Sequence, residues 1–184
     1  MIGKKLVRVL KFLNGTQDDL LTLKVNDLHV VRWYVDASFA VHPDFKSHSG
    51  GVMTMGDGAM MSGSNKQKLN TRSSCEAELI GADDFVTKIL WTKLFLEEQG
   101  YEIKENILYQ DNQSTLKLLV NGKRSSGKQT RALNIRYFFL HDQAEQKNLK
   151  FDYCPTGDML GDYNTNPLNR APFKRMRKWL MGMS

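Results

Sequence analysis

The chain has 184 residues, of which 41% are hydrophobic and 25% charged, and it contains only four prolines. These totals exclude a disordered or fibrous protein and favour one folded domain, alone or with a short appendage. The net charge of +6 favours anionic partners, nucleic acid first. Two cysteines without a CxxC pair indicate a reducing compartment, and four scattered histidines lack zinc-ligand spacing. No apolar run reaches the roughly 18 residues that span a bilayer, so we expect a soluble, intracellular chain without a membrane partner.

The first half of the chain predicts a helix, three strands and a second, long helix. Residues 4–13 place apolar side chains at helical spacing and leave a basic outer face. The run HVVRWYVDASF (29–39) is rich in β-branched and aromatic residues and predicts a strand that ends near Asp36. Two further runs flank Asp57-Gly58 with the spacing of a hairpin. The longest helical pattern covers residues 73–99.

The second half alternates strands and helices. The short apolar run NILYQD (106–111) predicts a strand covered on both faces, and Asn112 can cap the helix that follows it. After a basic loop (121–136) we expect a helix at about 132–146, a strand at 149–155, a short helix begun by Thr156 and a basic amphipathic helix at 172–181. The predicted fold is therefore α/β, with a five-stranded mixed sheet, three antiparallel strands followed by two parallel ones, and helices on both faces.

Four carboxylates occupy positions that suggest a metal site. They are Asp36, Glu76, Asp111 and Asp162. If the first and fourth strands are parallel neighbours, Asp36 and Asp111 lie at the same sheet edge, where ligands of open α/β sheets bind. Like charges there disfavour ionisation unless a cation neutralises them. Mg²⁺ or Mn²⁺ suits carboxylate ligands, and three or four such groups can hold two ions about 3.5–4 Å apart.

Each of these acids also has a purely structural interpretation. Ser73 and Glu76 match a capping box, in which Glu76 folds back onto a backbone amide. Asp111-Asn112 is an ordinary turn or cap signal, and Asp36 can simply end a strand. Taken singly, the residues do not decide between the two interpretations.

Two further acids, Asp158 and Glu78, are expected to have structural roles. Asp158 and Asp162 are expected at i and i+4 on one short helix, where Asp158 suits the helix dipole and Asp162 remains for the metal. Glu78 lies about 200° round the long helix from Glu76 and is expected to be structural or solvated. We therefore expect Glu76 within a few ångströms of the two strand acids.

Five ordered blocks of the sequence resemble the ribonuclease H domain of copia-type retrotransposon polyproteins. The blocks are YVDAS (34–38), SSCEAEL (73–79), ILYQDNQST (107–115), LNIRYFFL (133–140) and YCPTGDMLGDYNTNPL (153–168). Residues 4–23 also look like the end of the reverse-transcriptase region that precedes this domain in such elements. The resemblance divides the chain into a remnant of that connection (1–28), a ribonuclease H-like domain (29–168) and a basic C-terminal helix (169–184).

The resemblance implies the ribonuclease H fold and an endonuclease that cuts the RNA strand of RNA–DNA hybrids with two Mg²⁺ ions, which Mn²⁺ can replace. Carried over by position, the metal ligands and catalytic residues are Asp36, Glu76, Asp111 and Asp162. The expected partners are the hybrid and a reverse-transcriptase domain, and the chain is expected to be a monomer in the cytoplasm, within an element particle, or in the nucleus. Contacts to nucleic acid are expected from Lys66, Lys68, Arg72, Asn112, Gln113, Lys123, Arg124, Lys128 and Arg131.

Departures from the family pattern leave other functions open. Ala132 stands where the family has a histidine, Gly161 where it has an alanine, and Asn166 where it has a lysine. Gly161 is expected to cost helix stability relative to alanine. These changes fit either an active nuclease or a catalytically silent nucleic-acid-binding remnant of a retroelement. A nuclease of related fold that acts on DNA is a third hypothesis, which the order of the four acids supports less well.

Overall fold

The structure, a computed structural model, describes residues 2–121 and 131–183. The helices are α1 (Ile2–Asn14), α2 (Ser74–Glu98), α3 (Gln113–Asn121), α4 (Arg131–Glu145), α5 (Asp162–Thr165) and α6 (Arg170–Leu180). The strands are β1 (Lys24–Val25), β2 (Val30–Ser38), β3 (His48–Thr54), β4 (Gly56–Asp57), β5 (Met61–Lys66), β6 (Glu105–Gln110) and β7 (Lys150–Tyr153).

Five strands form one mixed sheet in the order β5-β3-β2-β6-β7. The first three strands pair antiparallel, whereas β6 pairs parallel with β2, and β7 pairs parallel with β6. This arrangement confirms the fold predicted from the sequence. The structure adds a pairing that the sequence did not suggest: β1 and β4 form a separate two-stranded antiparallel sheet.

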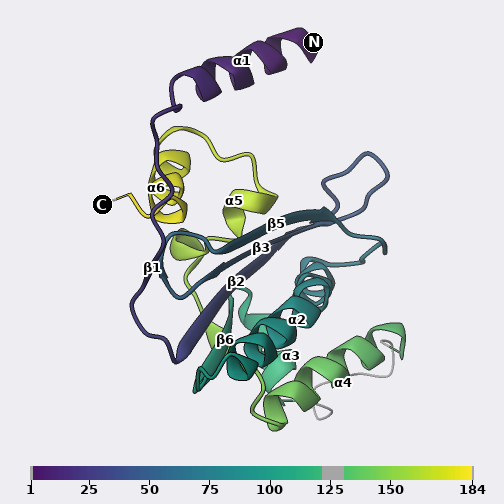
Figure 1. Ribbon diagram of the computed structural model, residues 1–184. Helices are drawn as coiled ribbons and strands as arrows, with labels where there is room; N and C mark the ends of the chain where they lie inside the picture. The colour runs from purple at the N-terminus through teal and green to yellow at the C-terminus, as the bar shows by residue number, and fades with distance from the viewer. Residues whose placement is uncertain (1, 122–130, 184) are drawn as a thin grey trace.

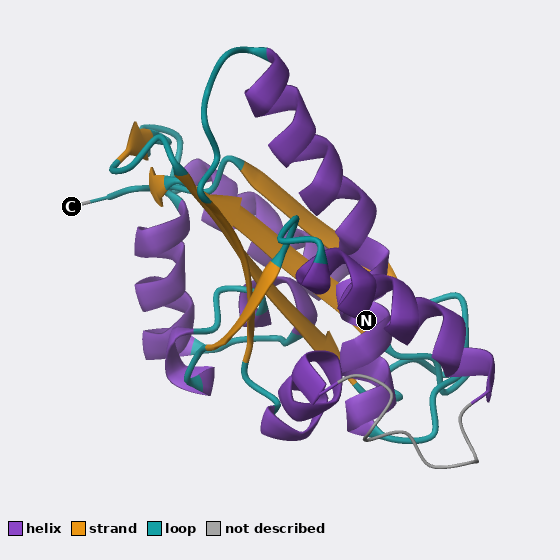
Figure 2. Ribbon diagram, turned by 90° about the horizontal axis from the view of Figure 1, so that it is seen from below, coloured by secondary structure: helices purple, strands orange, loops and turns teal. Residues whose placement is uncertain are grey.

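Helices cover both faces of the five-stranded sheet. Figure 1 shows α2, α3 and α4 on one side and α5 and α6 on the other, and Figure 2 shows the same layers from below. The main core lies under α2, where Trp33 and Val35 of β2 pack with Phe85 and Ile89 of the helix. Each of these four side chains is at most 2% exposed, so α2 is held firmly against the sheet.

The short helix α5 lies very close to the opposite face of the sheet. A Cβ at Gly161 would come within 2.9 Å of the Asp36 backbone nitrogen, and one at Gly50 within 2.6 Å of Thr165 Cγ2. Two glycines therefore allow α5 to approach β2 and β3 at the end of the sheet where Asp36 lies. The expectation that Gly161 is merely a helix-weakening change is incomplete, because its lack of a side chain permits this contact.

The N-terminal segment contacts the C-terminal helix. Phe12 meets Phe173 edge to face with ring centroids 5.7 Å apart, and Arg177 forms an ion pair with Asp19. The Thr22 amide donates to the Met181 carbonyl. Helix α1 itself projects from the body of the molecule and exposes half or more of Leu6, Val9, Leu10 and Leu13 (Figure 1). Among the described residues, none of the helices combines the length and the apolarity that crossing a membrane requires.

Candidate metal centre

Asp36 and Asp111 meet at one edge of the sheet because their strands run parallel. The register pairs Tyr34 with Tyr109, and two residues further along the same strands the chain reaches Asp36 and Asp111. Asp36 is 5% exposed and Asp111 is half-buried. The expectation that the parallel pair would bring these two acids together is confirmed.

The third carboxylate of the cluster comes from Glu78 in the second turn of α2. One oxygen from each of Asp36, Glu78 and Asp111 lies within 4.8 Å of the others. Glu78 is 5% exposed, and the Ala37 backbone amide donates to its carboxylate. The Gln110 side-chain amide also donates to it, over 3.3 Å. Three elements, β2, β6 and α2, therefore bring together an acidic triad that could hold a metal ion.

The structure corrects the position expected for Glu76. Its Oε2 accepts a hydrogen bond from the Arg72 backbone amide at 2.7 Å, while the Ser73 hydroxyl accepts one from the Glu76 amide. The second of these bonds is that of a capping box, and the first reaches the amide one residue before the N-cap Ser73, so the carboxylate turns back to the start of α2 and lies outside the triad. Glu78, expected to be structural or solvated, takes its place because the helix buries that side against the sheet.

A sequence signal for Glu78 did exist. Glu78 precedes Ala82, Phe85 and Ile89 by four, seven and eleven residues, which places it on the stripe that faces the core. A carboxylate on such a stripe needs a specific partner, because burial of an unpaired charge is costly. The helical stripe therefore favours Glu78 over Glu76 as the acid that faces the sheet.

The fourth acid, Asp162, lies beside Asp36 at the start of α5. Its carboxyl group is hydrogen-bonded to Asp36, and its charge raises the pKa of Asp36. Asn166 donates to Asp162 Oδ1 at 2.7 Å. The prediction that Asp158 lies on the same helix is wrong, because Asp158 ends a separate 3₁₀ turn at Thr156–Asp158. Asp162 therefore borders the triad, and its role as a metal ligand stays a prediction; the short helix that carries it begins six residues later than expected.

Burial and mutual repulsion make the cluster costly to ionise. Desolvation, followed by the charges of Asp36 and Asp111, raises the pKa of Glu78 to about 9. Desolvation, together with the charges of Asp162 and Asp111, raises the pKa of Asp36 to about 7 against the opposing hydrogen bond from Thr165. A divalent cation would neutralise this repulsion, and an all-oxygen set of carboxylates fits Mg²⁺ or Mn²⁺.

Neutral side chains hold each acid in place. The Thr165 hydroxyl donates to Asp36, and the Thr156 hydroxyl donates to Asp111 at 2.8 Å. Gln110 is fully buried; its Oε1 accepts from the backbone amides of Asp111 and Asn112, while its Nε2 donates to Glu78. The acids are therefore positioned by hydrogen bonds, which preorganises them for a cation.

The residues expected to contact nucleic acid take varied positions. Lys66 pairs with Asp44 at 2.8 Å, and Lys68, Arg72 and Gln113 are exposed. Asn112 Oδ1 accepts from the amides of Ser114 and Thr115, so this side chain caps α3. Lys123, Arg124 and Lys128 lie outside the described residues, and so does the side chain of Arg131. Their contacts with nucleic acid remain predictions.

Comparison with solved structures identifies the class of fold. The chain matches the N-terminal ribonuclease H domain of a Mycobacterium tuberculosis protein, solved as a fusion with maltose-binding protein, with a TM-score of 0.50 and 12% identity. The match covers 81% of this chain and 96% of that one. The chain therefore has a ribonuclease H-like fold, as its strand order and the position of its acids also indicate.

The sequence relatives are retrotransposon polyproteins. The chain is 31% identical over 176 residues to the retrovirus-related Pol polyprotein of transposon TNT 1-94 from Nicotiana tabacum, and 30% identical over 175 residues to that of transposon RE2 from Arabidopsis thaliana. These matches cover 95% and 94% of this chain but only 13% and 12% of the relatives. No family model matches the chain. The chain is therefore similar to one segment, about an eighth of the length, of copia-type retrotransposon Pol polyproteins, and the resemblance seen in its sequence blocks is confirmed.

Proposed function

We propose that this chain is a divalent-metal-dependent ribonuclease H that cleaves the RNA strand of RNA–DNA hybrids. The observation that carries the proposal is the buried triad of Asp36, Glu78 and Asp111, bordered by Asp162, at the carboxyl ends of two parallel strands. Its fold and its retrotransposon relatives support a nuclease of this class. The set of acids differs from the sequence-based prediction in one member, with Glu78 in place of Glu76.

These four acids would hold Mg²⁺ or Mn²⁺. The chemistry supplied by bound divalent ions is the activation of a water molecule and the stabilisation of the leaving oxygen of a phosphodiester. The chain's own residues orient the carboxylates: Thr165, Thr156, Gln110 and Asn166 fix their rotamers. Selectivity for RNA would rest on contacts to its 2′-hydroxyl groups.

A gel assay with the RNA strand of a hybrid labelled at one end tests the proposal. We expect cleavage in Mg²⁺ or Mn²⁺, no cleavage in chelator, and none of an all-DNA duplex. Asp36→Asn and Asp111→Asn should abolish cleavage while hybrid binding persists. A folded chain that binds Mg²⁺ and hybrid but never cuts would refute the proposal and favour the silent binding module.

A further inference from the structure

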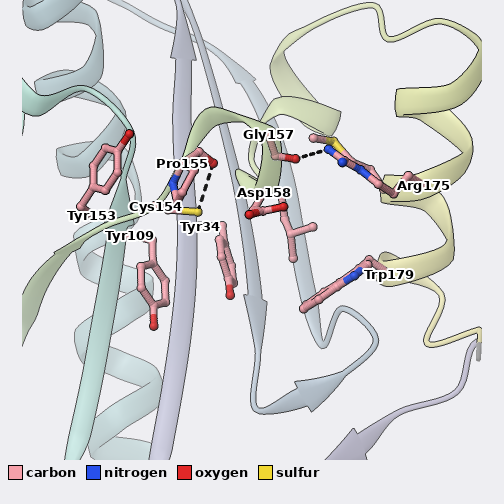
Figure 3. Close-up of a pocket in the computed structure, with 11 residues that line it drawn as sticks. Tyr34, Tyr109, Tyr153, Cys154, Pro155, Gly157, Asp158, Arg175 and Trp179 are labelled. Atoms are coloured by element: carbon pink, nitrogen blue, oxygen red, sulfur yellow. Dashed lines mark hydrogen bonds between the residues drawn. The ribbon is translucent and has the colours of Figure 1, made fainter.

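A cavity of about 420 Å³ lies between the sheet and α6, on the face opposite α2. Figure 3 shows the rings of Tyr34 and Tyr109 on its strand side and the indole of Trp179 on its helix side. The two tyrosine rings stack with centroids 4.9 Å apart, and Trp179 is 57% exposed. Aromatic side chains on both sides of a small cavity are suited to a flat ring between them.

The wall of this cavity is directly connected to the metal centre. Pro155, Gly157 and Asp158 line it, and Thr156, which lies among them in sequence, donates a hydrogen bond to Asp111. Tyr34 precedes Asp36 by two residues within β2 and therefore lies on the same face of the sheet, and its partner Tyr109 lies two residues before Asp111, which directly follows the end of β6. A molecule in the cavity would lie beside the acids.

The rim of the cavity carries positive charge. The sequence of α6, RAPFKRMRKWL, has five basic side chains and no acidic one. Arg175 lines the cavity, where its guanidinium donates to the Gly157 carbonyl. Lys174 and Lys178 are exposed next to it, and neither forms an ion pair within the part of the chain described by the structure. The cavity itself contains both Arg175 and Asp158, so its interior suits a neutral ring and its rim suits anionic groups.

We propose that this cavity binds the base of one unpaired nucleotide in a single-stranded extension of the nucleic acid. Every base offers a flat face that stacks on aromatic side chains, and its phosphates would meet the basic rim. A paired base does not fit this description, because its faces are already stacked within the duplex. The proposal rests on the proposed function only for the class of partner, a nucleic acid with a duplex region next to the acids.

Fluorescence anisotropy with a labelled hybrid in chelator tests this site. Three substrates are compared: a blunt hybrid, the same hybrid with a four-nucleotide single-stranded overhang, and the overhang with abasic sites in place of its nucleotides. We expect the normal overhang to bind about fivefold or more tighter than the blunt end, since stacking of one base is worth at least that much. The abasic overhang keeps its phosphates and should lose most of this gain.

Two exposed tryptophans provide a matched pair of variants. Trp179→Ala should remove the gain from the overhang, whereas Trp179→Phe should keep most of it. Trp91 is similarly exposed, 55% against 57%, but lies on α2 across the sheet, so Trp91→Ala should retain both the gain and the cleavage of blunt hybrid. Tyr153→Ala is a second variant at the cavity if Trp179→Ala unfolds.

The outcomes separate this inference from the proposed function. Equal binding of blunt and overhang hybrids, a full gain with the abasic overhang, or an equal loss in Trp91→Ala would each overturn it. Competition by a free mononucleotide with no gain from an overhang would also overturn it in favour of a nucleotide-binding pocket. Cleavage of blunt hybrid by the unaltered chain is measured separately: cleavage without the gain refutes only the base pocket, and the gain without cleavage refutes only the nuclease.

Discussion

Replacing Glu78 with glutamine should stabilise the metal-free protein while destroying its metal site. The pKa of Glu78 is raised from 4.5 to about 9, so the native state keeps a proton at pH 7 that the unfolded state has lost. The difference of 2.5 pH units between 4.5 and 7, at about 1.36 kcal/mol per unit, gives a cost of about 3 kcal/mol. Glutamine removes this cost, because its amide is neutral at every pH, so we expect up to about 3 kcal/mol of added stability.

Urea unfolding in chelator at pH 7 measures this gain, and thermal melting with and without Mg²⁺ measures the metal site. Addition of Mg²⁺ should raise the melting temperature of the unaltered chain, because a ligand that binds only the native state stabilises it. Glu78→Gln should show no such rise and no cleavage of hybrid. The gain in stability and the loss of metal response come from the same carboxylate.

Glu76→Gln is the matched control, two residues away on the same helix. It weakens the hydrogen bond to the Arg72 amide and should cost about 0.5–1 kcal/mol, as other cap substitutions do. It should keep the Mg²⁺-dependent rise in melting temperature and the cleavage. If Glu76→Gln lost the metal response and Glu78→Gln retained it, the assignment of Glu78 to the metal centre would be wrong.

Three further perturbations test the same region. In chelator, the stability of the unaltered chain should fall as pH rises from about 4.5 towards 9, because the unfolded state releases the Glu78 proton at lower pH than the native state does. Saturating Mg²⁺ should reduce this fall. Urea midpoints across that pH range measure both effects, and a pH-independent midpoint in chelator contradicts the expectation. Gln110→Leu removes the side chain that joins Glu78 to two backbone amides and should weaken Mg²⁺ binding about 10- to 100-fold. Calorimetry measures this affinity, and an unchanged value would mean that Gln110 contributes only to packing. Gly161→Ala should destabilise the protein by about 1–3 kcal/mol, because the added Cβ would collide with the Asp36 backbone, and this cost outweighs the better helix propensity of alanine. Urea unfolding measures the change, and a stabilised variant would show that α5 moves away freely.

The sheet and two of the acids could be predicted because local patterns determine them. Strand NILYQD and strand HVVRWYVDASF have clear boundaries, and a parallel pair brings Asp36 and Asp111 to the same edge without further information. The identity of the third acid depends instead on the rotation of α2 about its axis. A Cβ at Gly81 would lie 3.3 Å from the Ala37 Cβ, so the close approach of the helix to β2 fixes which residues face the sheet. The apolar stripe through Ala82, Phe85 and Ile89 indicates this rotation, and the tertiary contact at Gly81 fixes it, so that Glu78 faces the sheet.

The helices after Cys154 are also hard to predict from the sequence, because tertiary contacts decide where they begin and end. A helical pattern from Thr156 to Asp162 has the right spacing, yet the chain breaks after Asp158 because Met159 and Leu160 are buried. The pairing of β1 with β4 involves only two residues on each strand, far apart in sequence, and a Cβ at Gly56 would lie 2.2 Å from the Lys24 carbonyl oxygen. Long-range contacts of this kind leave no periodic trace.

The departures from the family pattern are accommodated within the site. The absence of a side chain at Gly161 lets α5 approach Asp36 closely, and Asn166 donates to Asp162 where the family has a lysine. Each of the four acids therefore keeps a hydrogen-bonding partner. At the same time the cluster lowers the stability of the metal-free fold, because burial and repulsion raise the pKa of both Asp36 and Glu78. A group of buried acids that costs folding free energy, yet is held in place by neutral donors, is better explained by a ligand than by the needs of the fold. This physical argument favours the metal-dependent nuclease over the silent remnant.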